Sequence, residues 1–188
     1  MIDDRQPTND DRRSTTIGHR RSILHPPSSI LDPRWSVVSG RWSAVVIGYG
    51  SDLRGDDAVG RRAAEAVAAW ELPQVRALAV HQLTPELAAT LATVDLAIFV
   101  DACAATQAGE VETRSIGPAA VDAAIGHSGD PRALLALAEA LYGRSPRAWS
   151  IGVPATSFAF GADLSPVAQR GLADALQQIY QLVLSSQL

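Results

Sequence analysis

The chain has 188 residues, of which 47% are hydrophobic and 19% charged, and its formal net charge at pH 7 is −4. This length allows one domain of ordinary size plus a tail, and the negative charge gives no reason to expect binding to nucleic acid or to a membrane surface. All 16 basic residues are Arg, which excludes a Schiff-base lysine and the lysine of a P-loop. A single cysteine, Cys103, cannot form an internal disulfide, as expected of a cytoplasmic protein. No apolar stretch approaches the roughly 18 residues that span a bilayer.

Residues 1–40 differ in composition from the rest of the chain. They contain paired acids, paired arginines and Pro26-Pro27, with few apolar residues. Such a segment buries too little apolar surface to offset its ordering entropy, so we predict a disordered N-terminal extension. We expect its His19 and His25 to be solvated and without function, and it lacks the apolar core of a secretion signal. The folded domain is expected over residues 43–188.

From Ser43 onward, strand-like and helix-like patterns alternate along the chain, which predicts an α/β layer sandwich with one core. The strands are predicted at Ala44–Gly48, Val75–His81, Leu96–Asp101, Val111–Ser115 and Ala148–Val153. The helices are predicted at Asp57–Trp70, Pro85–Thr93, Ala119–Ala124, Pro131–Tyr142 and Pro166–Leu184. Three of these helices begin with a capping residue followed by proline, at Thr84-Pro85, Asp130-Pro131 and Ser165-Pro166.

A glycine-rich turn connects the first predicted strand to the first predicted helix, within Val45–Gly60. Turns of this kind usually bind phosphates through free backbone N–H groups and the helix dipole. Here the helix opens on Asp56 and Asp57, whose carboxylates would repel a phosphate and attract a cation. The turn therefore indicates metal or cation chemistry. We expect Asp56 to cap the helix or to form hydrogen bonds within the turn.

Three polar residues are expected at the carboxyl ends of the parallel strands, the edge where sites form in such sheets. Asp57 lies in the first turn of the first predicted helix, and Asp101 ends the third predicted strand. His127 lies in the loop before the helix that Asp130 caps. Two carboxylates and an imidazole form a ligand set that suits Ni, Zn, Mn or Fe. Each of the three also has an ordinary structural interpretation, as dipole partner, cap or loop residue.

Other catalytic arrangements receive less support from the residues. Cys103 and His127 could form a Cys–His pair, but we predict an unreactive, half-buried thiol because no orienting third group is evident. Neither Ser51 nor Ser128 lies in the Gly-x-Ser-x-Gly turn that exposes a nucleophilic serine.

The segment Gly48–Gly60 resembles the signature of the hydrogenase maturation endopeptidases, which remove a C-terminal extension from the large subunit of [NiFe] hydrogenases after nickel insertion. Ser51 stands here where that signature usually has Asn. The resemblance covers nearly all of the predicted domain, in five segments in the same order. The other four similar segments are His81–Leu87, Val100–Ala102, Leu134–Gly143, and Ile151–Pro154 followed by Phe160–Pro166.

The resemblance implies a three-layer αβα sandwich around a twisted, mostly parallel five-stranded sheet. It also implies that Asp57, Asp101 and His127 contact a metal, which is nickel supplied by the large-subunit precursor, the partner of the protein. Water would be activated by the metal or by a carboxylate, with Asp57 or Asp101 as the base, and His81 could line the cleft. Two alternatives remain open: a non-catalytic nickel- or precursor-binding maturation chaperone, and a nucleotide- or nucleoside-binding enzyme, against which Asp56 and Asp57 count.

Overall fold

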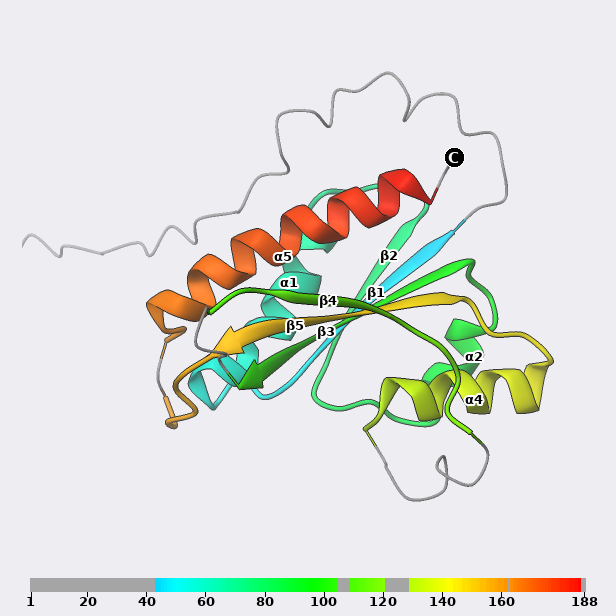
Figure 1. The fold of residues 1–188 in the computed structure, drawn as a ribbon, viewed down its shortest axis with the longest axis horizontal. Helices are drawn as coiled ribbons and strands as arrows, with labels where there is room; N and C mark the ends of the chain where they lie inside the picture. The colour runs from blue at the N-terminus through cyan, green and yellow to red at the C-terminus, as the bar shows by residue number, and fades with distance from the viewer. Residues whose placement is uncertain (1–42, 105–108, 121–128, 162, 187–188) are drawn as a thin grey trace, which may run out of the picture.

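The computed structural model describes residues 43–104, 109–120, 129–161 and 163–186 (Figure 1). Its five strands are β1 (Ala44–Tyr49), β2 (Val75–Val80), β3 (Leu96–Ala104), β4 (Glu112–Ile116) and β5 (Arg147–Ala155). Its helices are a short 3-10 turn (Gly55–Ala58), α1 (Val59–Ala68), α2 (Leu87–Leu91), α4 (Pro131–Tyr142) and α5 (Pro166–Ser185). Within these ranges, no helix is both long and apolar enough to cross a membrane.

The strands form one sheet in the order β2-β1-β3-β5-β4. Strands β2, β1, β3 and β5 run parallel, and only the edge strand β4 is antiparallel to its neighbour β5. The prediction of a mostly parallel five-stranded sheet is therefore confirmed. In this topology the ends of β1, β3 and β5 meet at one edge, where the N-terminal turn of α1 also lies.

Helices cover both faces of the sheet, as the three-layer prediction requires (Figure 1). Alternation along β1 directs Val46 toward α1 and α5 and directs Val45 and Ile47 toward α2 and α4. Neighbouring residues of β3 divide in the same way, with Ile98 on the first face and Phe99 on the second. These strands are buried on both faces, which explains their continuous apolar sequence.

Two of the three predicted helix starts are confirmed by their hydrogen bonds. The Asp130 side chain accepts from Arg132 N at 2.8 Å, and Ser165 Oγ accepts from Ala168 N at 3.2 Å. The third is wrong, because α2 begins at Leu87 and Thr84 does not cap it. Instead, the carbonyl of Thr84 accepts from Leu87 N in a turn that precedes the helix.

Other boundaries differ by a few residues. Strand β3 continues three residues beyond Asp101, because β5 is also longer than predicted and pairs with it up to Ala104 and Ala155. The helix predicted from Asp57 begins as the 3-10 turn. The predicted helix at Ala119–Ala124 lies mostly outside the described residues, as does the whole of segment 1–40.

Candidate active site at the carboxyl edge of the sheet

The glycines of the turn allow α1 to pack against β1 at the distance of bare backbone. A Cβ on Gly48 would lie 1.8 Å from the carbonyl oxygen of Gly60, and a Cβ on Gly60 would lie 2.3 Å from that of Val100. Gly50 has a φ of +131°, and a Cβ there would lie 1.9 Å from the carbonyl oxygen of Asp57. Only glycine fits these three positions, because any side chain would collide with the backbone of a neighbouring element. The backbone of Asp57 therefore packs directly against Gly50.

Asp57 is held by the turn itself. Its Oδ2 accepts a hydrogen bond from Ser51 N at 3.0 Å, while Ser51 Oγ accepts from Leu53 N at 3.3 Å. The serine that stands in place of the usual asparagine thus retains a side-chain hydrogen bond to the turn. The side chain of Asp57 is half-buried, so part of it remains open to a ligand.

Asp56 points the other way and is fully buried. Its carboxylate accepts from the backbone N–H groups of Thr156, Ser157 and Ser165 at 2.7, 2.9 and 2.6 Å, and from Ser165 Oγ at 2.8 Å. Burial raises the pKa of Asp56, but these hydrogen bonds outweigh it and hold the pKa below its usual range. The prediction that Asp56 caps its own helix or bonds within the turn is wrong, because its partners are in the connection between β5 and α5.

Asp101 lies in the part of β3 that extends past the helical cover. Its Oδ1 accepts from Ala102 N at 2.8 Å, and the Tyr49 hydroxyl donates to the carboxylate. The pKa of Asp101 is raised to about 6, because the effect of burial, with a smaller one from the negative charge of Asp57, exceeds the lowering by the two hydrogen bonds. Asp57 and Asp101 therefore interact electrostatically, as two carboxylates at one sheet edge should.

Tyr49 is a site residue that the sequence reasoning missed. Burial, the charge of Asp101 and the hydrogen bond to it raise the pKa of the Tyr49 phenol above its usual value. The phenol is thus a neutral donor at physiological pH. Its place between the two glycines Gly48 and Gly50, at the end of β1, was the available signal.

The third predicted ligand, His127, lies outside the described residues. Across the described ranges, no group of three His, Cys, Asp or Glu side chains is arranged to hold a metal ion. The three-residue metal set therefore stays a prediction, of which the structure brings two members, Asp57 and Asp101, within electrostatic reach of each other.

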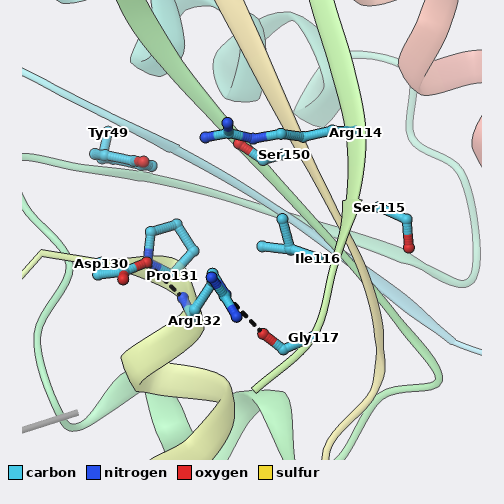
Figure 2. Close-up of a pocket in the computed structure, with 9 residues that line it drawn as sticks. All are labelled: Tyr49, Arg114, Ser115, Ile116, Gly117, Asp130, Pro131, Arg132 and Ser150. Atoms are coloured by element: carbon cyan, nitrogen blue, oxygen red, sulfur yellow. Dashed lines mark hydrogen bonds between the residues drawn. The ribbon is translucent and has the colours of Figure 1, made fainter. Parts of the chain in front are cut away.

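A groove adjoins Asp101 on the face of the sheet that α4 covers. It consists of a hollow of about 150 Å³ that includes Asp101 and Glu112, and one of about 580 Å³ that reaches Asp130 at the start of α4. Both hollows are lined by Tyr49, Arg114 and Ser150 (Figure 2). Arg114 and Ser150 were not identified from the sequence; the alternation Glu112, Arg114, Ile116 was the signal that these side chains share one face.

The structure also describes two other side chains named from the sequence, Cys103 and His81. Burial, followed by the charges of Glu112 and Asp101, raises the pKa of the Cys103 thiol, in agreement with the prediction of an unreactive thiol. His81 follows β2 and is hydrogen-bonded to Arg61 Nη1, at 2.9 Å through Nδ1. Arg61 also pairs with Asp52 at 2.9 Å, so His81 contributes to holding the glycine turn from outside.

No protein-family model matches the chain, and no curated protein sequence matches it. Solved structures do match. The hydrogenase maturation protease HycI of Thermococcus kodakarensis has a TM-score of 0.59 and 24% identity, covering 79% of this chain and 96% of its own. The hydrogenase maturating endopeptidase HybD of Escherichia coli has a TM-score of 0.57 and 22% identity, covering 77% and 93%. The hydrogenase 2 maturation peptidase of a Thaumarchaeota archaeon has a TM-score of 0.57 and 20% identity, covering 75% and 97%.

The chain has the fold of the hydrogenase maturation proteases. The match extends over nearly the full length of those proteins, so the shared part is the whole αβα sandwich. It agrees, at the level of fold, with the resemblance seen in Gly48–Gly60 and the later segments. In the turn itself Ser51 N already donates to the carboxylate of Asp57, which counts against the nucleotide-binding alternative because a phosphate would need such N–H groups free.

Proposed function

We propose that the protein is an endopeptidase that removes the C-terminal extension of the nickel-loaded large-subunit precursor of a [NiFe] hydrogenase. The observation that carries the proposal is the pair of carboxylates, Asp57 and Asp101, at the carboxyl edge of a fold shared with proteases that mature these hydrogenases. In this proposal nickel belongs to the substrate, and the protein recognises the bound nickel and so cuts only the loaded precursor.

The chemistry of the two side chains fits a cation of the substrate. Burial and, to a smaller extent, the negative charge of Asp57 raise the pKa of Asp101, and a divalent cation beside the two carboxylates would offset that charge. Without nickel, a precursor offers no such partner, which would explain selectivity for the loaded form. His127 would complete the ligand set as the nitrogen donor.

Hydrolysis requires a group that removes a proton from water. Asp101, with a pKa of about 6, is mostly ionised at neutral pH and is still a better proton acceptor than an ordinary carboxylate. Tyr49, a neutral donor to that carboxylate, orients it. A carboxylate that ligates nickel has its pKa lowered, so the two carboxylates take different roles. We assign the general base to Asp101 and assign to Asp57, with His127, the binding of the metal-loaded substrate.

The test is incubation of the protein with nickel-loaded and nickel-free precursor, followed by mass measurement of the large subunit. We expect loss of the C-terminal peptide from the loaded precursor alone. Asp57→Asn, Asp101→Asn and His127→Ala should each abolish cutting. Asp174→Asn, on the exposed face of α5, is the matched control and should cut normally.

The same experiment distinguishes the chaperone alternative. Binding of the loaded precursor without any cleavage would reject the endopeptidase and favour a non-catalytic nickel- or precursor-binding role. Full cleavage by any one of the three site variants would remove that residue from the proposed site.

A further inference from the structure

The two hollows adjoin each other, since Tyr49, Arg114 and Ser150 line both of them, and together we call them the groove. The larger hollow is within the size range of ligand-binding pockets, at about 580 Å³. The smaller hollow includes Asp101. The larger one lies beside the edge strand β4 and reaches the start of α4 (Figure 2). Hollows that adjoin along the strands of a sheet are suited to an extended peptide segment.

Arg114 occupies the junction of the two hollows. In β4 it is opposite Ser150 of β5, and Figure 2 shows its guanidinium extending across the sheet toward Tyr49. Arg114 is exposed, and within the described ranges no carboxylate lies at ion-pair distance from it. Its charge is therefore available to a ligand.

The other charged groups on the larger hollow each have a contact within the fold. Asp130 accepts from Arg132 N at 2.8 Å as the cap of α4, and Arg132 Nε donates to the carbonyl of Gly117 at 3.3 Å (Figure 2). These contacts leave Arg114 as the cation best placed to choose among substrates.

The position of Arg114 relative to Asp101 indicates which part of a substrate it meets. The positive charge of Arg114 acts on the Tyr49 hydroxyl, and Tyr49 in turn donates to Asp101. Tyr49, Arg114 and Asp101 all line the smaller hollow, and Arg114 forms no ion pair with Asp101, so the guanidinium lies beside the carboxylate that we propose as the base without binding it. A group bound by Arg114 would belong to a residue near the scissile bond rather than to the bond itself.

We propose that this groove binds the C-terminal extension of the substrate and that Arg114 pairs with an acidic side chain in it. Arg114 is thus a specificity-determining residue for an anionic group of the peptide. This inference rests on the proposed function, because it takes the extension of a protein substrate as the ligand.

The test compares the wild type, Arg114→Gln, Arg114→Lys and the matched control Arg170→Gln on the nickel-loaded precursor. Arg170 is an exposed arginine of α5, on the opposite side of the sheet. We expect Arg114→Gln to raise KM about tenfold with kcat within about twofold, the effect of losing one charge-assisted hydrogen bond. Arg114→Lys should recover part of the loss, and Arg170→Gln should match the wild type.

A precursor whose extension carries Asn and Gln in place of its acidic residues supplies the second arm. The wild type should show the raised KM on it, and Arg114→Gln should show no further rise, as for two partners of one contact. Salt of about 1 M, which shortens the screening length to about 3 Å, should raise KM for the wild type more than for Arg114→Gln.

An unchanged KM for Arg114→Gln, additive effects of the two changes, or an extension that has no acidic residue would each overturn this inference while leaving the endopeptidase proposal in place. Absence of cleavage by the wild type would overturn both.

Discussion

Asp56 and Ser165 are 109 residues apart in the sequence, yet the Asp56 carboxylate accepts from both the N–H and the hydroxyl of Ser165, at 2.6 and 2.8 Å. With Thr156 and Ser157 as further donors, this one carboxylate joins the glycine turn to the connection between β5 and α5. The adjacent residue, Asp57, faces the candidate site. Of the two neighbouring acids, Asp56 therefore stabilises the fold, and Asp57 stays the predicted ligand-binding residue.

Replacing Asp56 by Asn should destabilise the domain strongly. The amide NH₂ group of Asn would face donors that now bind the carboxylate, leaving buried N–H groups without acceptors. We expect a loss of about 3 kcal/mol or more, from about 1–3 kcal/mol for each buried group left unsatisfied. Urea unfolding checks this, with Asp174→Asn as the control. A change of less than about 1 kcal/mol would contradict the role given to Asp56.

Asp101→Asn should have the opposite effect on stability. The pKa of Asp101 in the folded protein is about 6, against about 4 for an unfolded Asp, so the folded state binds the extra proton between these values. Stability of the wild type therefore falls as pH rises from about 4 to about 6. The Asn variant carries no such charge and should melt a few degrees higher at pH 7, with the gap closing below about pH 4.

Thermal melts of the metal-free protein across this pH range measure the effect. An Asn variant that is less stable than the wild type at pH 7 would show that the ionised Asp101 does not cost the fold free energy. In the endopeptidase proposal the same variant loses cleavage, so stability and activity should change in opposite directions.

Tyr49→Phe should raise the pKa of Asp101 above its present value of about 6, because the hydroxyl now stabilises the ionised carboxylate. Carbon-13 NMR of the Asp101 side chain in the metal-free protein can follow the titration directly. A pKa that stays the same or falls would mean that the phenol does not donate to Asp101 in solution.

Gly50→Ala should disrupt the site from the backbone. The new Cβ would lie 1.9 Å from the carbonyl oxygen of Asp57, at a φ of +131° that side chains rarely adopt. We expect a lower melting temperature and loss of precursor cleavage. Gly143→Ala is the control: it also has a positive φ, of +69°, but its Cβ would meet no atom within 4 Å. It should cost stability without stopping cleavage, and wild-type activity of Gly50→Ala would contradict the prediction.

Sequence reasoning succeeded where the deciding signal is local. The caps at Asp130 and Ser165 gave the starts of α4 and α5, and continuous apolar runs identified β1 and β3 as central strands. It also identified Asp57 and Asp101 as acids that belong to one sheet edge. Their electrostatic interaction is consistent with that expectation, while their roles remain predictions.

It failed where partners are distant in the chain. Nothing near Asp56 reveals that its acceptor capacity is used by Thr156, Ser157 and Ser165. Likewise, Arg114 and Tyr49 line one hollow only because β4 pairs with β5 in the strand order β2-β1-β3-β5-β4. Local periodicity does not reveal the order of strands in a sheet. Adjacent acids look equivalent in the sequence, and only the fold shows that one is buried and the other is not.

The hydrogen-bond partners of Asp56 follow it by 100 residues or more, so this contact can form only late in synthesis of the chain. A ribosome makes the glycine turn about a hundred residues before it makes Thr156, Ser157 and Ser165. Until those residues emerge, the Asp56 carboxylate lacks its hydrogen-bond donors and the turn beside it lacks this support. A chain truncated before Thr156 would keep Asp57 and Asp101 but lose these donors to the neighbouring Asp56. The turn that carries Asp57 would gain this support only after Ser165 had been made.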